Sequence, residues 1–189
     1  MKKMSLLFIV TLIFGLSTFA AAAEDYSSTI NVFRDSPIPA GYFKTAYGYA
    51  VFPTIGKAGF VVGGSYGVGQ VYRAGQVTGK SSVIEGSIGF QAGGKAFSEI
   101  IFFKDKSAYD EFISGNFEFD ATAQAIAVTV GAGAQGGTTG VTAGASAGPK
   151  SDIQADPKYF KGTITFVHSM GGLMYELSLG GQKFSYEAI

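Results

Sequence analysis

The sequence predicts a mainly β domain of the α+β type. We expect a compact antiparallel β-sheet or sandwich with short N-terminal helices and one helix near residues 105–114. Glycine accounts for 28 of 189 residues, about twice its usual share. From Tyr47 onward, short stretches with alternating apolar and polar residues, separated by glycines, fill most of the chain. Helical spacing of apolar residues is clear only in two stretches, 26–33 and 109–113.

The predicted helices flank the glycine-rich part of the chain. The apolar residues before Pro37 are spaced as on one face of a short helix: Tyr26, Ile30 and Phe33. The stretch 36–46 predicts a turn and a second short helix. In the segment 104–114, Ser107 is the expected N-cap and Gly115 the expected end of a further helix.

The predicted strands follow the alternation of apolar residues and the position of turn residues. Ala74-Gly75 is typical of a hairpin turn, and Gly93-Gly94 predicts a second hairpin between 83–91 and 96–103. Gly63-Gly64 and Gly67 are interpreted as breaks between strands. The remaining predicted strands are one that ends at Val51-Phe52-Pro53, then 58–62, 68–72, 116–120, 125–130, a final hairpin of 164–168 with 173–179, and the C-terminal 184–186.

The first 23 residues are interpreted as a secretory signal. Lys2 and Lys3 precede an apolar run, 6–16, that is too short to span a bilayer, and the small residues 20–23 then suit signal peptidase. Removing this segment leaves 12 basic and 14 acidic residues in a single predicted domain, 24–189. We therefore expect an exported bacterial protein that is periplasmic or secreted, or peripheral to the membrane.

The composition argues against several classes of function. The chain has no cysteine, one histidine and a formal net charge of zero, so we expect no metal site, no cofactor and no nucleic-acid partner. Residues 63–67 and 144–148 match G-x-S-x-G, and 74–81 matches a relaxed phosphate loop. Both motifs work only where a helix follows, whereas a strand is expected after 74–81 and no helical pattern follows the others. The protein is therefore predicted not to be an enzyme.

One long stretch resembles a known family. Residues 46–53 read A-x-G-x-A-x-F-P, and Lys57-Ala58-Gly59-Phe60 and Gly63-Gly64 follow. This sequence closely resembles the signature of the SYLF domain family. The similarity continues through 86–94, 100–106, 171–175 and 180–184, so it covers nearly all of 24–189.

The resemblance implies a lipid-binding module with a compact β-rich fold. Eukaryotic relatives bind phosphoinositides and some bind actin, while bacterial relatives are exported. The segment 25–36, which is a basic helix in eukaryotic members, has Arg34 as its only base here. We therefore expect weak binding of anionic lipid headgroups through bases and aromatics of the glycine-rich strands. The candidate lipid-contact residues are Lys57, the first choice because it lies inside the signature, with Lys44, Arg73, Lys80, Lys95 and Tyr66, near the further aromatics Tyr47, Tyr49, Phe60 and Tyr72.

Two alternatives remain open at this point. One is a structural or protein-interaction factor of the bacterial envelope without lipid affinity, which would use an exposed sheet edge or the Ala/Gly-rich segment 121–148. The other is a small outer-membrane β-barrel, suggested by the glycine–aromatic alternation of 181–186. Against the barrel, the chain ends in Ile189 rather than an aromatic residue, and the helix near 105–114 interrupts the strands.

Overall fold

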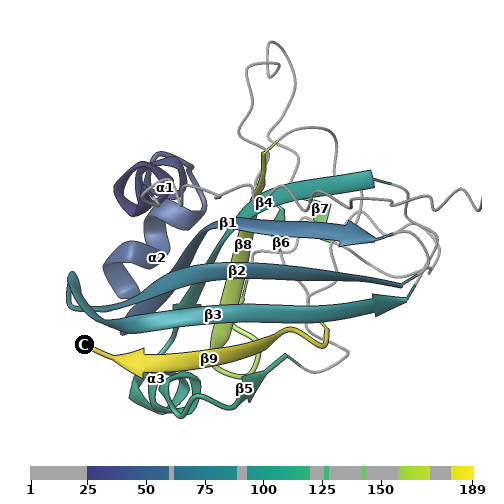
Figure 1. The fold of residues 1–189 in the computed structure, drawn as a ribbon. Coiled ribbons are helices and arrows are strands. Elements are labelled where there is room, and N and C mark those ends of the chain that lie inside the picture. Colours follow the sequence, from purple (N-terminus) through teal and green to yellow (C-terminus); the bar gives the residue numbers. More distant parts are fainter. Residues whose placement is uncertain are drawn as a thin grey trace, which may run out of the picture.

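The computed structural model describes residues 25–59, 62–88, 93–119, 126–127, 142–143, 158–170 and 180–189. They form one sheet with helices packed against it (Figure 1), which confirms the predicted mainly β fold and its helix near 105–114. Within these ranges no helix is long and apolar enough to cross a membrane. The elements are α1 (Tyr26–Arg34), α2 (Pro39–Thr45), β1 (Gly48–Gly59), β2 (Val62–Arg73), β3 (Gln76–Ile88), β4 (Gly93–Phe103), α3 (Lys106–Ile113), β5 (Phe117–Glu118), β6 (Ile126–Ala127), β7 (Thr142–Ala143), β8 (Thr163–Ser169) and β9 (Lys183–Ala188).

The strands are hydrogen-bonded in the order β5-β9-β3-β2-β1-β4-β8-β6-β7. Of these neighbouring pairs, only β6 and β8 run parallel. Strands β1 to β3 follow one another, and β4 then lies beside β1, which is a Greek-key arrangement. The predicted hairpin of 83–91 with 96–103 is therefore wrong, because β3 pairs with β2 and β9 while β4 pairs with β1 and β8. The short link between β3 and β4 can reach about 17 Å. This is enough to cross the three strand spacings, about 14 Å in all, that separate the two strands in the sheet.

Strands β1 and β2 are longer than the sequence predicted. The expected end of the first strand at Pro53 is wrong, since β1 continues to Gly59. Its register with β2 shifts between Val51 and Thr54, which marks a β-bulge around Pro53. A bulge leaves a residue out of the ladder, so the missing N–H of proline is tolerated there. The expected breaks at Gly63-Gly64 and Gly67 also lie inside a strand, β2.

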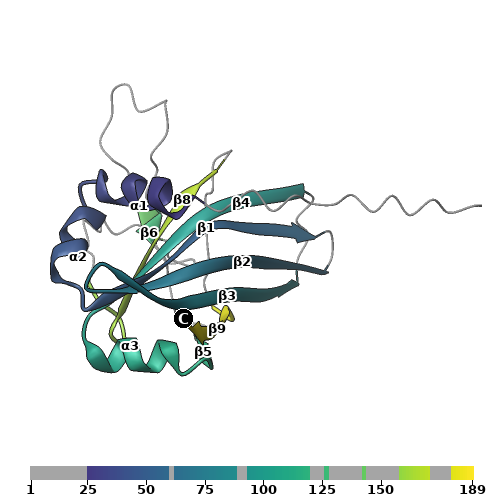
Figure 2. The ribbon, with the colours of Figure 1, turned by 60° about the vertical axis from the view of Figure 1, so that its left-hand side comes forward.

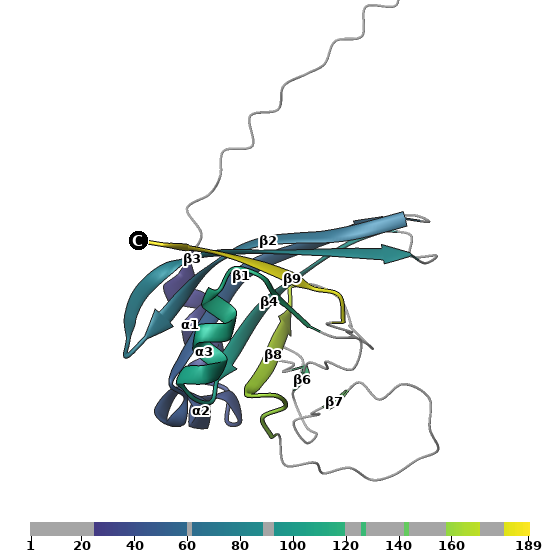
Figure 3. The same cartoon turned by 90° about the horizontal axis from the view of Figure 1, so that it is seen from below.

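Different helices cover the two faces of the sheet (Figure 2). We call the side covered by α3 the inner face, and the sheet curls around it (Figure 3). The outer face is partly covered by α1, which buries Ile30 and Phe33 there, and by α2, whose Tyr42 and Phe43 are partly buried against the same core. The inner core includes Ala50, Phe52, Ile55, Val71, Val83, Phe97, Phe103, Tyr109, Phe112 and Phe184, and the outer core includes Val51, Tyr72, Ile100, Phe102, Ile164 and Phe166.

The turn and capping residues explain where several elements begin and end. The predicted hairpin turn at Ala74-Gly75 is confirmed, with φ of 50° and 77°, the left-handed values that such two-residue turns require. The predicted cap Ser107 is wrong: Asp105 is the N-cap of α3, and its carboxylate accepts from the Ala108 N–H at 3.1 Å. Gly115, at φ 79°, follows the helix end as expected.

Some predicted segments lie outside the described residues. They are the predicted signal segment 1–23, the predicted return strand 173–179, the polar linker 149–157, and most of the Ala/Gly-rich segment 121–148, of which only β6 and β7 are described. The first strand of the predicted last hairpin is present as β8, with Ile164 and Phe166 buried on one face as their alternation predicted.

Candidate functional site on the outer face of the sheet

Part of the outer face is not covered by α1 and α2, and large apolar side chains are exposed there. Tyr66 on β2 and Ile84 on β3 are directly paired across the strands, and they are 58% and 53% exposed. On the other side of Tyr66 its partner is Gly56, whose missing side chain leaves the surface open. Two neighbouring apolar residues of this size, both more than half exposed, form a continuous apolar surface rather than a scattered exposure.

The row that contains Ile84, Tyr66 and Gly56 continues across β4 to the residue that follows β8. Gly56 pairs with Ala96 on β4, whose carbonyl accepts from the Met170 N–H at 3.0 Å. The Met170 sulfur contacts the Thr54 hydroxyl at 4.0 Å, and the side chain is 51% exposed. We call Tyr66, Ile84 and Met170 together the outer patch.

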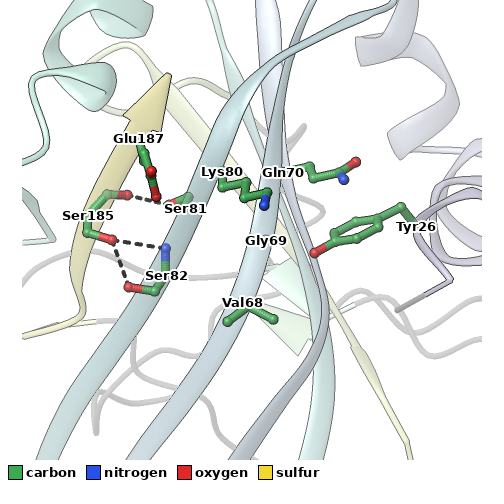
Figure 4. A pocket seen from close by; sticks show the side chains of 9 residues that line it. All are labelled: Tyr26, Val68, Gly69, Gln70, Lys80, Ser81, Ser82, Ser185 and Glu187. Carbon is green, nitrogen blue, oxygen red and sulfur yellow. Dashed lines mark hydrogen bonds between the residues drawn. The ribbon is translucent and has the colours of Figure 1, made fainter. Parts of the chain in front are cut away.

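A polar groove lies beside the outer patch, between α1 and strands β2, β3 and β9 (Figure 4). Its volume is about 420 Å³. In Figure 4 the Lys80 side chain and the Tyr26 ring extend toward one another over Gly69. The full lining is Tyr26, Val68, Gly69, Gln70, Lys80, Ser81, Ser82, Ser185 and Glu187.

Hydrogen bonds between β3 and β9 fix the serine side of this groove. The Ser82 and Ser185 hydroxyl oxygens are 2.7 Å apart, and Ser185 Oγ also accepts from the Ser82 N–H at 3.2 Å. One row further along, Lys80 lies opposite Glu187. The groove therefore offers hydroxyls and an ammonium group to a ligand with hydrogen-bond acceptors and negative charge, and a carboxylate at its rim.

Two of the predicted lipid-contact residues, Lys80 and Tyr66, lie on this face, four residues apart in the register of β2 with β3. The first choice, Lys57, lies elsewhere: its amine is 2.9 Å from Glu85 Oε1 on the inner face. Ser65, which pairs with both residues in the ladder, donates to the other Glu85 oxygen at 3.0 Å. The Lys57 and Glu85 side chains are only 17% and 6% exposed. This geometry gives Lys57 a partner inside the fold.

Arg73 lies at the opposite end of β2. Its guanidinium carbon is 5.8 Å from the centre of the Tyr109 ring, a cation–π contact. Arg73 borders a second groove of about 410 Å³, together with Phe43, Tyr47 and Tyr49. Burial raises the pKa of Tyr49, in spite of an opposing effect of Arg34.

Two other predicted residues, Lys44 and Tyr72, line neither the polar groove beside the outer patch nor the groove that Arg73 borders. Lys44 is exposed on α2, and the Tyr72 ring is buried, stacked on Tyr49 with ring centres 4.8 Å apart. Burial raises the pKa of Tyr72 to about 12. Lys95 pairs with Lys57 in the β1–β4 ladder, while its side chain and all of Phe60 lie outside what the structure describes.

Sequence reasoning missed Ile84, Met170 and the serines of the groove. The alternation around Val83 indicated a strand but not which face is left uncovered. Sequence reasoning also missed three buried polar residues of the inner face, Glu85, Glu99 and Gln182. Glu99 carried a usable signal, because it takes an inward position between the apolar residues Phe97 and Ile101.

The local motifs have the structural context that was expected. Ser65 of the first G-x-S-x-G lies inside β2, and the segment 74–81 consists of the Ala74-Gly75 turn and the first residues of β3, which continues as a strand to Ile88. The second G-x-S-x-G, 144–148, lies outside the described residues. In the part of the chain that is described, no three His, Cys, Asp or Glu side chains are grouped as a metal site would require.

No model of a known protein family matches the sequence. The chain is similar to Beta cell expansion factor A of Aeromonas veronii, with 26% identity over 161 residues. The alignment covers 84% of this chain and 52% of that protein, so the chain spans about half the length of this relative.

Proposed function

We propose that this protein is an exported, non-catalytic module of the SYLF type that binds membrane lipid at the bacterial envelope through the outer face of its sheet. The observation that carries the proposal is the direct pairing of exposed Tyr66 and Ile84 beside the groove that contains Lys80. The resemblance of residues 46–69 to the SYLF signature supports the same function, and the apolar segment 6–16 supports export.

The chemistry of this face suits the boundary between lipid headgroups and acyl chains. Tyrosine is favoured at that depth because its ring is apolar and its hydroxyl is polar. Apolar area transferred from water is worth about 25 cal/mol per Å². Lys183 lies opposite Ile84, where its amine is 3.3 Å from Glu118 Oε2, and Lys80 lies in the groove four residues along β3 from Ile84. A base close to an anionic surface contributes about 1 kcal/mol, and the pairing with Glu118 offsets part of this contribution at Lys183. Together, the apolar contribution and the small charge contribution predict weak, reversible binding to a headgroup phosphate rather than stable anchoring.

Co-sedimentation with vesicles tests this proposal. We expect the purified protein to bind vesicles of phosphatidylethanolamine with phosphatidylglycerol. The double variant Tyr66→Ser/Ile84→Ser should bind at least about tenfold more weakly, because two apolar anchors are lost. Val77→Ser is the matched control, since it removes a partly exposed apolar side chain of β3 outside the outer patch and should bind as the wild type does.

The charge on Lys80 gives a second readout of the same face. Lys80→Ala should lower binding about fivefold to vesicles that contain phosphatidylglycerol, and less to pure phosphatidylethanolamine. Absence of binding to either composition, or equal binding by the wild type and the Tyr66→Ser/Ile84→Ser variant, contradicts the proposal. If the same double variant instead loses an envelope protein in pull-downs, the outer patch is a protein-interaction surface.

A further inference from the structure

The curl of the sheet brings two distant strands into contact through their side chains. In the strand order, β9 and β4 are four positions apart, which is about 19 Å in a flat sheet. Gln182, the residue before β9, nevertheless places its Nε2 atom 3.4 Å from Glu99 Oε2 on β4. Neither residue has any exposed surface. The pair therefore bridges the interior of the curl.

The backbone around Gln182 is fixed on its other side. The Phe119 N–H donates to the Gln182 carbonyl at 3.0 Å, and the Gly181 N–H donates to the Phe119 carbonyl at 2.9 Å. Gly181 has a φ of 87°, as the tight turn before β9 requires. A contact made by the Gln182 side chain thus connects β4 to the whole turn that leads into β9.

Each partner of this contact has one oxygen without a hydrogen bond, Glu99 Oε1 and Gln182 Oε1. Both atoms are acceptors, and a buried acceptor without a donor is costly. A proton on Glu99 Oε1 supplies the missing donor, because a carboxylic acid and a primary amide can pair through two hydrogen bonds, N–H to O and O–H to O. One proton therefore accounts for both unpartnered atoms.

We propose that Glu99 and Gln182 form a proton-dependent clamp, in which neutral Glu99 holds the turn before β9 against β4 across the interior of the sheet. The other charged groups on the described inner face agree with a neutral acid. Lys57 of β1 and Glu85 of β3 pair with each other, so among the side chains that the structure describes none supplies Glu99 with a counter-charge; the side chain of Lys95, on the same strand, lies outside them. On β8, the inward residues Thr165 and Val167 have side chains that do not ionise near neutral pH. Burial first, and then the charge of Glu85, raise the pKa of Glu99 to about 8, against a lowering effect of Gln182.

The sign of the effect on stability follows from linkage. In the unfolded chain Glu99 releases its proton near pH 4.5, whereas in the folded protein it keeps the proton up to about pH 8. The stabilisation is therefore complete below pH 4.5 and is lost as the pH rises through this window. The ratio of folded to unfolded protein should fall by up to about tenfold per pH unit, and by about 400-fold between pH 5 and pH 8, from this residue alone.

The experiment combines pH-dependent urea denaturation with carboxyl NMR. In wild-type protein labelled with ¹³C at glutamate carboxyls, we expect one buried resonance to titrate near pH 8 and to disappear in Glu99→Gln. The decline in the denaturation midpoint from pH 5 to pH 8 should be strongly reduced in Glu99→Gln, which keeps the shape and a neutral amide–amide pair. Amide exchange at residues 182–184, corrected for intrinsic rates, should increase above pH 8 in the wild type only.

A swapped double variant separates the clamp from a general effect of Glu99. In Glu99→Gln/Gln182→Glu the acid and the amide exchange places, so the pH dependence should return. The proposal is overturned if the Glu99 carboxyl titrates below about pH 6, or if Glu99→Gln shows the same decline of its midpoint as the wild type. The test needs no lipid, so it stands apart from the proposed binding function.

Discussion

Substitution of Lys57 by methionine is expected to lower the free energy of unfolding by about 3–5 kcal/mol. Methionine keeps the apolar stem of the side chain but removes the ammonium that lies 2.9 Å from Glu85. The Glu85 carboxylate is 6% exposed, and among the described side chains it would keep the Ser65 hydroxyl as its remaining hydrogen-bond partner. A buried charge left without its counter-ion is far more costly than a lost surface ion pair, which is worth about 1 kcal/mol or less. Urea denaturation at pH 7 measures the difference.

The double variant Lys57→Met/Glu85→Leu is the control for this prediction. Since it removes both charges together, most of the lost stability should return, as it does when a buried ion pair is replaced by apolar residues. A loss below about 1 kcal/mol for Lys57→Met would show that the pair behaves like an exposed one. Vesicle binding by the folded fraction of Lys57→Met should equal that of the wild type. If Lys57 were a direct lipid contact, this variant would instead bind more weakly without a change in stability.

Lys57 also illustrates what the sequence could and could not predict about the site. It is the base inside the family-like signature, so the pattern favoured it as a lipid contact. Its partner Glu85 is 28 residues away, and only the ladder pairing Lys57 with Ser65, and Ser65 with Glu85, places the three in one row. Register of this kind depends on which strands become neighbours, and alternation within a single strand does not contain that information.

The same difference between local pattern and strand neighbours explains which parts of the fold the sequence predicted correctly. Apolar spacing was enough to predict α1 and α3, because each buries a stripe at helical period: Ile30 with Phe33, and Tyr109 with Phe112. The turn at Ala74-Gly75 was predictable from local chemistry. The position of β4 beside β1 was not, since a link as short as 89–92 permits a hairpin as well as a crossing over two strands. Gly67 inside β2 was mistaken for a break, although an added Cβ there would be 2.7 Å from Ile55 Cγ1 on β1, so its role is a close contact with that strand.

Gly69→Ala tests this role of glycine, and we expect it to lower the free energy of unfolding by about 3 kcal/mol. Gly69 lies across from the bulge of β1, between the pairs Val51–Gln70 and Thr54–Val68. An added Cβ would be 2.5 Å from Phe52 Cδ1 and 2.7 Å from the Val51 carbonyl oxygen. The Phe52 ring is fully buried and packs against Phe184, with ring centres 5.5 Å apart, so it has no free space to move into.

Gly56→Ala is the matched control, because Gly56 also lies in the central strands but has nothing within 4 Å of the added methyl group. Its stability should stay within about 0.5 kcal/mol of the wild type, since an open position has no steric cost and alanine restricts the unfolded chain. Urea denaturation of the two variants under one condition makes the comparison direct. Equal stability of Gly69→Ala and Gly56→Ala would mean that the bulge does not press Phe52 onto β2, and that glycine at 69 serves the flexibility of the chain rather than close packing.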